Sequence, residues 1–236
     1  MVRPLPAPKA ILFDLGDTIL REGEYQPLVG ITHLLGSAEL RPNVDRESAC
    51  AASLALLSEI RGKRDSEITE FPFQSWLRLI VDQFCADRDI QLAGAELEFW
   101  RVSAVMEPQP GIAAVLAGLA ERRIPIGVVS NAMFSGALLS WELARHGFAD
   151  AFRFVMSSAD YGVQKLHPAI FRAAAARLGL APEQIWFVGD SYHKDVRGAR
   201  HAGMNGIWYN PGQAAAPKDE PTVQIADWAD FGKMLA

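Results

Sequence analysis

Residues 11–20 read Ile-Leu-Phe-Asp-Leu-Gly-Asp-Thr-Ile-Leu, a sequence typical of a buried strand followed by a tight turn. The largely apolar run at 9–13 is typical of a short strand buried on both faces of a parallel sheet. A carboxylate is costly to bury, so we expect Asp14 at the mouth of that strand, facing solvent or a cation. Gly16 permits a tight turn after the strand, and the Thr18 hydroxyl can bond to the nearby backbone. By itself, Asp14 is equally well explained as the cap of a turn or helix.

Composition narrows the classes of protein to consider. The 236 residues suit one large domain, or a core with a smaller insert, and half of them are apolar. A net charge of −5 argues against a nucleic-acid-binding face, which is usually basic. Cys50 and Cys85 are expected to be reduced core residues. The N-terminus lacks the apolar run of a signal peptide, and no later stretch is long and apolar enough to span a bilayer. The sequence therefore predicts a cytoplasmic protein with neither a nucleic acid nor a membrane as its partner.

Residues 21–106 have helical patterns and no convincing rhythm of strands and turns. Helices are expected at 47–60, 73–84 and 97–106, where apolar residues recur with helical spacing. The aromatic residues of this region are expected to pack mostly in the core, since helical spacing normally means packing; they are Phe71, Phe73, Trp76, Phe99 and Trp100. A proline-rich linker at 107–111 ends the region. This part of the chain is predicted to be an all-helical insert.

From Gly111 onward, helices and strands alternate. Strands are expected at 124–129, 152–156, 185–188 and 206–209, and the intervening segments have the pattern of amphipathic helices. Pro168 suits the first turn of one helix, and Gly203 suits the end of another. Alternation of this kind indicates an α/β fold with a doubly wound parallel sheet and right-handed crossovers.

Polar residues gather where these strands end, and parallel α/β sheets bind ligands at that edge. They are Asp14, Ser130, Asn131, Lys165, Asp190 and Asp195. Each has an ordinary explanation alone, as a helix cap or a solvated lysine. Together they indicate a cation site, because three neighbouring carboxylates repel one another unless a divalent cation lies among them. Hard oxygen ligands in a partly open site suit Mg²⁺, which pairs with phosphate, and Ser130 and Lys165 would supply a donor and a positive charge. The set predicts a site for phosphoryl chemistry.

Four motifs in order carry a family resemblance. They are Phe-Asp-Leu-Gly-Asp-Thr at 13–18, Val-Val-Ser-Asn at 128–131, Lys165 ahead of His167 and Pro168, and Val-Gly-Asp-Ser-Tyr-His-Lys-Asp at 188–195. In these motifs the chain resembles the haloacid dehalogenase (HAD) superfamily of hydrolases. The resemblance implies a Rossmann-like, three-layer α/β/α core with a parallel sheet in the order 5-4-1-2-3. It places the core at 1–20 and 107–236, and a mobile helical cap of the C1 type at 21–106.

The same resemblance implies roles for single residues. Asp14 would be the nucleophile that attacks phosphorus and forms an aspartyl-phosphate, which divides one difficult displacement into two easier ones. Ser130 would bind the transferring phosphoryl group with backbone donors near Asn131, and Lys165 would offset the negative charge. The cofactor Mg²⁺ would be held by Asp14, the backbone carbonyl of Gly16, Asp190 and Asp195.

One position departs from the family pattern. Two residues after the nucleophile, phosphatases of this family usually have a second Asp that protonates the leaving group, and here that position is Gly16. Asp17 follows it, and we regard Asp17 as a candidate substitute acid although its direction from the backbone would differ. General acid catalysis is typically worth roughly 10²–10⁴-fold, so its loss should slow substrates with poor leaving groups most.

Three functions remain open from the sequence. The first is a Mg²⁺-dependent phosphatase of a small phosphorylated metabolite with a modified first motif, which either favours substrates with good leaving groups or takes its acid from water or from the cap. The second is dehalogenation or phosphonate cleavage. Dehalogenases, however, generally lose the acidic cluster. Phosphonate cleavage would need a lysine in the cap, and Lys63 is the one lysine of the insert. The third is a catalytically weak member that binds phosphorylated ligands or a protein partner.

The cap is expected to choose the substrate and to exclude water when it closes. Its candidate contacts are Tyr25, His33, Arg61, Arg64, Trp76, Arg78 and Trp100. The sequence does not rank them, and it leaves both a monomer and a homodimer open.

Overall fold

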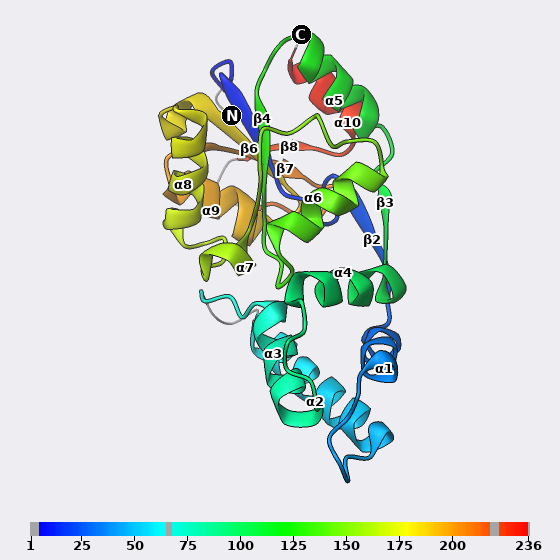
Figure 1. Cartoon of the computed structure of the whole chain (residues 1–236). Coiled ribbons are helices and arrows are strands. Elements are labelled where there is room, and N and C mark those ends of the chain that lie inside the picture. Colours follow the sequence, from blue (N-terminus) through cyan, green and yellow to red (C-terminus); the bar gives the residue numbers. More distant parts are fainter. Residues whose placement is uncertain (1–4, 65–67, 218–221, 236) are drawn as a thin grey trace.

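The computed structural model describes residues 5–64, 68–217 and 222–235. Six strands form one parallel sheet in the order β5-β4-β1-β6-β7-β8 (Figure 1). Their bounds are β1 Ala10–Phe13, β4 Ile126–Ser130, β5 Val155–Ser157, β6 Ile185–Gly189, β7 Asn205–Tyr209 and β8 Val223–Ile225. The predicted α/β fold and the order of its five strands are confirmed, and β8 adds a sixth strand beside β7.

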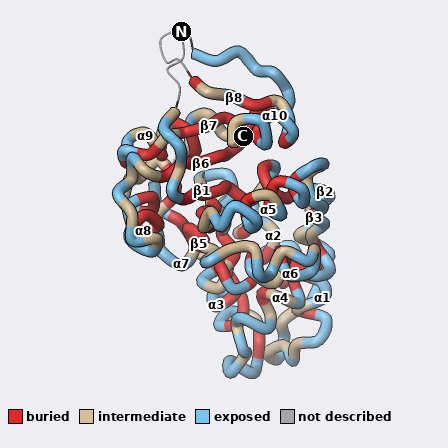
Figure 2. Tube along the Cα trace, turned by 90° about the horizontal axis from the view of Figure 1, so that it is seen from above, coloured by how far each residue is buried: buried red, intermediate tan, exposed pale blue. Residues whose placement is uncertain are grey.

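Helices cover both faces of this sheet, which makes the core three-layered. On one face lie α5 (Ile112–Glu121), α6 (Gly136–Arg145) and α10 (Trp228–Met234), and on the other lie α8 (Pro168–Leu178) and α9 (Gly198–His201) (Figure 1). Side chains alternate between the faces along a strand. In β1, Phe13 packs on Trp228 of α10, with ring centroids 6.0 Å apart, while Leu12 belongs to the opposite cluster with Phe171 of α8. The strands of the sheet are largely buried (Figure 2).

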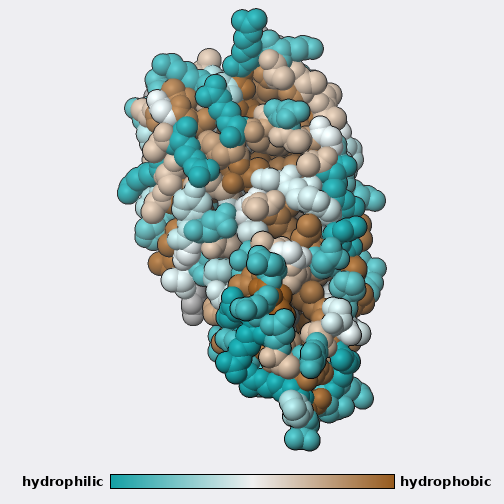
Figure 3. All heavy atoms as spheres, in the orientation of Figure 1, coloured by the Kyte–Doolittle hydropathy of each residue, from teal (hydrophilic) through white to brown (hydrophobic). Residues whose placement is uncertain are grey.

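A helical insert follows β1 in the sequence and lies below the sheet in Figure 1. It consists of α1 (Pro27–Ser37), α2 (Arg46–Arg64), α3 (Phe73–Phe84) and α4 (Leu92–Ser103). Phe73 and Phe99 pack with centroids 4.5 Å apart, and Trp100 reaches Phe134 of the core at 4.6 Å. These rings are buried, as expected, whereas Phe71 is 36% exposed. On the face shown in Figure 3, hydrophilic side chains gather over the insert with smaller hydrophobic patches between them.

The two ends of the insert are not helical. They form a two-stranded antiparallel ribbon of β2 (Leu20–Tyr25) and β3 (Ala104–Pro108), in which Arg21 lies opposite Glu107. The helix expected at 97–106 therefore ends at Ser103. The strand forms because the two ends of the insert leave the core side by side and pair with each other. Such pairing between residues far apart in the sequence does not show in local periodicity. The predicted domain boundaries after residues 20 and 106 lie within this ribbon and stay a prediction.

Two buried glutamates join α4 of the insert to α6 of the core. Glu96 accepts hydrogen bonds from the backbone N–H and the hydroxyl of Ser135, at 2.8 and 2.7 Å. Glu142 accepts one from the indole N–H of Trp100 at 2.7 Å. Burial of a carboxylate is costly unless hydrogen bonds compensate it, so these contacts hold the insert in a defined position on the core.

Cys50 and Cys85 are free and buried, as expected. Within the described ranges, no helix combines the length and the apolar composition needed to cross a membrane.

Candidate active site

Asp14 lies directly after β1, at the carboxyl edge of the sheet. Its side chain is almost fully buried and forms an ion pair with Lys165, which comes from the loop before α8. The Lys165 ammonium also lies 2.6 Å from Oδ1 of Asp195. Residues far apart in the sequence, 14, 165 and 195, are thus joined by one buried ammonium group at the sheet edge where the sequence analysis expected them to gather.

Asp190 and Asp195 complete an acidic cluster with Asp14. Asp190 follows β6, and Asp195 lies in a short π-helical segment, Tyr192–Arg197. One carboxylate oxygen from each of the three residues lies within 4.8 Å of the other two. The N-terminal end of the π-helical segment is capped by Ser191, whose backbone N–H donates to Oδ2 of Asp195 at 2.9 Å.

Glycine at 189 is required by this arrangement. A Cβ atom at Gly189 would lie 2.6 Å from Cβ of Asp195 and would overlap its carboxylate. The bare backbone at the end of β6 therefore lets the Asp195 side chain reach back over the strand to Lys165.

The electrostatics of the cluster favour binding of a further cation. Burial raises the pKa of Asp190 to about 7, and the negative charges of Asp14 and Asp195 contribute to this rise. Burial also raises the pKa of Asp195, and Lys165 only partly opposes the effect. For Lys165, burial acts to lower the pKa, but Asp14 and Asp195 outweigh it and hold the ammonium in its charged form. Three carboxylates thus share one buried positive charge.

Thr18 connects the loop after β1 to the end of β6. Its fully buried hydroxyl accepts a hydrogen bond from the backbone N–H of Asp190 at 3.1 Å. As a donor it lies 3.3 Å from Oδ2 of Asp14 and 3.4 Å from Oδ1 of Asp190. The sequence suggested a hydrogen bond from this hydroxyl to nearby backbone. In the structure the hydroxyl lies between the carboxylates of Asp14 and Asp190.

Asn131 positions the loop that carries Lys165. Its side-chain oxygen accepts a hydrogen bond from the backbone N–H of Lys165 at 2.6 Å, and its amide nitrogen donates to Gln164 at 3.3 Å. Gln164 in turn donates to the backbone carbonyl of Arg64, in the insert, at 2.9 Å. Ser130, the last residue of β4, is buried at the same edge of the sheet.

Ser158, which directly follows β5, joins the core to a partly buried ion pair of the insert. Arg64 binds Glu70 with two hydrogen bonds, of 2.7 and 2.8 Å, and the Ser158 hydroxyl donates to the same carboxylate at 2.6 Å. A bidentate pair with a further donor is well compensated for its burial.

A cavity of about 140 Å³ lies between the sheet edge and the insert. Gly16, Ser130 and Asn131 line it from the core. Four of the seven candidate cap residues line it from the insert and the ribbon: Tyr25, Arg61, Arg64 and Trp100. The guanidinium of Arg61 lies over the Tyr25 ring, 4.4 Å from its centroid. The cavity therefore has two arginines on its insert side and two glutamates, Glu22 and Glu24, on its ribbon side.

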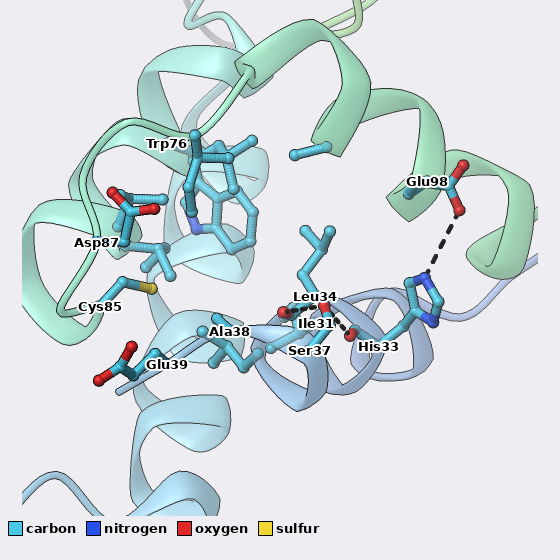
Figure 4. Close-up of a pocket in the computed structure, with 16 residues that line it drawn as sticks. Ile31, His33, Leu34, Ser37, Ala38, Glu39, Trp76, Cys85, Asp87 and Glu98 are labelled. Atoms are coloured by element: carbon cyan, nitrogen blue, oxygen red, sulfur yellow. Dashed lines mark hydrogen bonds and ion pairs between the residues drawn. The ribbon is translucent and has the colours of Figure 1, made fainter. Parts of the chain in front are cut away.

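The remaining cap candidates lie elsewhere. His33 and Trp76 line a separate, mainly apolar cavity of about 380 Å³ inside the insert, where His33 lies 3.7 Å from Glu98 (Figure 4). Arg78 donates to the backbone carbonyl of Arg88. None of the catalytic, phosphate-binding or metal-ligand candidates from the sequence lines the cavity of Figure 4.

The loop between Asp14 and β2 differs from the expected turn. Asp17, rather than Gly16, has the left-handed backbone conformation, with φ of 51°, which aspartate tolerates better than most residues. The Asp17 carboxylate accepts a hydrogen bond from the backbone N–H of Glu22 at 3.1 Å, so it supports the turn.

Glu22 is a site residue that the sequence analysis did not identify. It lines the cavity beside Gly16, and a Cβ atom at Gly16 would lie 3.3 Å from Cδ of Glu22. Glu22 is exposed along its strand, and the part of its surroundings that is shielded from water raises the pKa of its carboxyl group, as do the charges of Asp17 and Asp14. Its position in the first strand of the ribbon gave no local signal, because the ribbon itself was not expected.

The residues present fit a divalent cation. Three converging carboxylates with oxygen atoms this close, and one lysine among them, have the hard ligands and the uncompensated charge that suit Mg²⁺. The structure supports Asp14, Asp190 and Asp195 as a candidate ligand set on these grounds.

Comparison with known proteins agrees with this geometry. A family model described as haloacid dehalogenase-like hydrolase matches residues 8–203. A curated relative, the glyceraldehyde 3-phosphate phosphatase of Methanopyrus kandleri, is 31% identical over 203 residues, which cover 83% of this chain and 81% of that protein.

Solved structures share the fold. A HAD phosphatase from Thermococcus onnurineus matches with a TM-score of 0.64 at 22% identity, over 96% of this chain and 97% of that one. A 2-haloacid dehalogenase from Pseudomonas syringae pv. Tomato DC3000 matches with the same TM-score at 23% identity, over 97% and 98%. The fold alone therefore does not separate these two chemistries.

Proposed function

The chain belongs to the haloacid dehalogenase-like hydrolases, and we propose that it is a Mg²⁺-dependent phosphatase of a small phosphorylated metabolite. The observation that carries the proposal is the cluster of Asp14, Asp190 and Asp195 around the buried Lys165. The likeness to a curated phosphatase over four fifths of both chains supports it.

In the proposed reaction, Asp14 attacks phosphorus and forms an aspartyl-phosphate, which water then hydrolyses. Lys165 holds the Asp14 carboxylate in place and offsets the charge of the phosphoryl group, and Ser130 donates a hydrogen bond to that group. Mg²⁺, held by Asp14, Asp190 and Asp195 with the backbone carbonyl of Gly16, would stabilise negative charge on the phosphoryl oxygens. Asn131 contributes by positioning the Lys165 backbone.

The alternative chemistries fit the site less well. Displacement of a halide from carbon needs no divalent cation, so a dehalogenase would not use the acidic cluster. Phosphonate cleavage needs an insert lysine near the substrate, but Lys63 is exposed, pairs with Glu59 at 2.6 Å and does not line the cavity beside Gly16. A catalytically weak binding protein would not need a nucleophile held between a lysine and a cation site.

The size of the cavity favours a small substrate, and its insert side offers arginines to an anionic group. Its volume of about 140 Å³ and the arginines at 61 and 64 suit a short phosphorylated metabolite. Glyceraldehyde 3-phosphate, named for the Methanopyrus kandleri relative, is the first candidate to test.

The test is release of inorganic phosphate from p-nitrophenyl phosphate and glyceraldehyde 3-phosphate, with Mg²⁺ and with EDTA. We expect Mg²⁺-dependent release by the wild type and none above background by Asp14→Asn, which preserves side-chain size. Release that survives EDTA or the Asp14→Asn substitution would contradict the proposal. Absence of release from a panel of phosphate esters, with halide released from a 2-haloacid, would establish the dehalogenase alternative.

A further inference from the structure

An alkyl phosphate is a poor substrate without a proton donor, because its leaving group departs as a strongly basic alkoxide. The position two residues after Asp14 is Gly16, which has no side chain to supply the proton. For such a substrate the proton has to come from another residue or from water.

Glu22 of β2 occupies the space that a side chain at Gly16 would fill. A Cβ atom built on Gly16 would lie 3.3 Å from Cδ and 3.6 Å from Cγ of Glu22, and closer still to Oε1. The carboxyl group of Glu22 thus lies over the backbone of Gly16 and lines the cavity that also contains Ser130. We infer that Glu22 is the proton donor of this enzyme and replaces the side chain that Gly16 lacks.

The acids of the site that the sequence analysis named have different tasks. Asp14 and Asp195 bind Lys165, and Asp190 belongs to the acidic cluster. Asp17, the substitute suggested by the sequence, accepts the backbone N–H of Glu22 through Oδ1 at 3.1 Å. Asp17 therefore acts as a positioning residue: it fixes the start of β2 and so the backbone from which the Glu22 side chain extends.

Charged groups surround Glu22 from both sides. Asp14 and Asp17 face it from the loop after β1, and Arg61 and Arg64 face it from α2. Both arginines line the same cavity as Glu22, on the side of the insert.

The role of Glu22 as proton donor rests on the proposed phosphatase activity, and the protons balance in the two steps of that reaction. As Asp14 forms its bond to phosphorus, the bond from phosphorus to the ester oxygen breaks, and Glu22 gives its proton to that oxygen. In the second step the Glu22 carboxylate takes a proton from water while the water oxygen bonds to phosphorus and the bond from Asp14 to phosphorus breaks. Inorganic phosphate leaves, and Glu22 is again protonated.

The test compares leaving groups in Glu22→Gln. We expect hydrolysis of an alkyl phosphate, such as glycerol 2-phosphate, to fall about 10²–10⁴-fold, because its alkoxide needs a proton. Hydrolysis of p-nitrophenyl phosphate should fall less than about 10-fold, because p-nitrophenolate leaves readily without one. Glu107→Gln, which removes a charge from the neighbouring strand of the ribbon, is the matched control and should leave both rates unchanged.

A double variant tests whether an aspartate at position 16 can replace Glu22 as the proton donor. In Gly16→Asp/Glu22→Ala the new aspartate has room, since the Glu22 carboxyl is gone, and we expect alkyl phosphate hydrolysis at least about 10-fold above that of Glu22→Ala alone. Magnesium affinity of Glu22→Gln, measured by calorimetry, should stay within about threefold of the wild type, since Glu22 is not proposed as a ligand.

Several results would overturn the inference. Equal losses on both esters, no loss on the alkyl ester, or a lost Mg²⁺ affinity in Glu22→Gln would each remove Glu22 as the donor. These outcomes leave the phosphatase proposal intact as long as the wild type is active and Asp14→Asn is not. Failure of the wild type on every ester would remove both.

Discussion

Lys165 supplies the buried positive charge that opposes the carboxylates of the candidate site. Its ammonium is 3% exposed and contacts the carboxylates of Asp14 and Asp195. One buried positive charge cannot offset three carboxylates, so the cluster without metal retains protons that ordinary aspartates lose. This imbalance links the stability of the protein to pH and to metal.

The first prediction concerns Asp190, whose pKa burial raises to about 7. A raised pKa means that the folded chain binds this proton more tightly than the unfolded chain does. Its stabilising contribution is therefore complete below about pH 4 and is lost as the pH rises through about 7. In EDTA, the free energy of unfolding should fall by on the order of 1–2 kcal/mol between about pH 5 and about pH 8, since the carboxyl is partly exposed.

Urea unfolding of the wild type and Asp190→Asn across this pH range measures the effect. The asparagine variant does not titrate, so its stability should change less with pH than that of the wild type. Identical slopes for the two proteins would show that Asp190 does not retain a proton in the folded state.

Several of the site residues that could be predicted from the sequence lie at the ends of buried strands. Asp14, Ser130 and Asp190 each come after an apolar run, and the topology of a parallel sheet brings such positions together. Glu22 and Thr18 could not be placed in this way. Their contacts depend on how the loop after β1 folds back, which no periodic pattern shows.

At the scale of elements, the packing of α1 against α4 depends on a glycine. A Cβ atom at Gly30 would lie 2.5 Å from the Phe99 ring, whereas one at Gly36 of the same helix meets nothing within 4 Å. Phe99 is fully buried against Phe73, so its ring has little freedom to move.

This contact predicts opposite effects of one substitution at two sites. Gly30→Ala should lower the free energy of unfolding by about 1–3 kcal/mol through overpacking. Gly36→Ala should leave it unchanged or raise it by up to about 1 kcal/mol, because alanine favours a helix over glycine. Thermal or urea unfolding measures both, and a Gly30→Ala protein as stable as the wild type would mean that the α1–α4 contact is looser than described.

The elements themselves were predictable to different degrees. The helix at 73–84 was predicted with the bounds of α3, because its apolar residues follow one face. The ribbon of β2 and β3 was missed, because its two strands are separated by the whole helical insert. Its residues pair only when the fold brings both ends of the insert together.

At the scale of the whole molecule, buried polar contacts set how the insert sits on the core. Glu96 is 1% exposed and accepts hydrogen bonds from Ser135, at the start of α6, and from Gln74 at 2.7 Å. Glu98, two residues along the same helix, is about half exposed and pairs with His33 and Arg101 on the surface.

We therefore expect Glu96→Gln to destabilise the protein by about 1–3 kcal/mol, since charge-assisted hydrogen bonds are lost in a buried place. Glu98→Gln, the matched control, should change stability by less than about 0.5 kcal/mol. Hydrogen exchange should also speed up at the α4–α6 contact in Glu96→Gln alone. Equal effects of both variants would show that the buried contact does not hold the insert.

The central claim is that Asp14 carries the phosphoryl group during turnover. The most direct measurement is rapid acid quenching of the enzyme during hydrolysis of a phosphate-labelled substrate in Mg²⁺, followed by mass spectrometry of the peptide that contains Asp14. The account predicts one phosphoryl group on Asp14 in the quenched wild type and none in Asp14→Asn. Turnover by the wild type with no phosphoryl group on that peptide, or with the label on another residue, would contradict it.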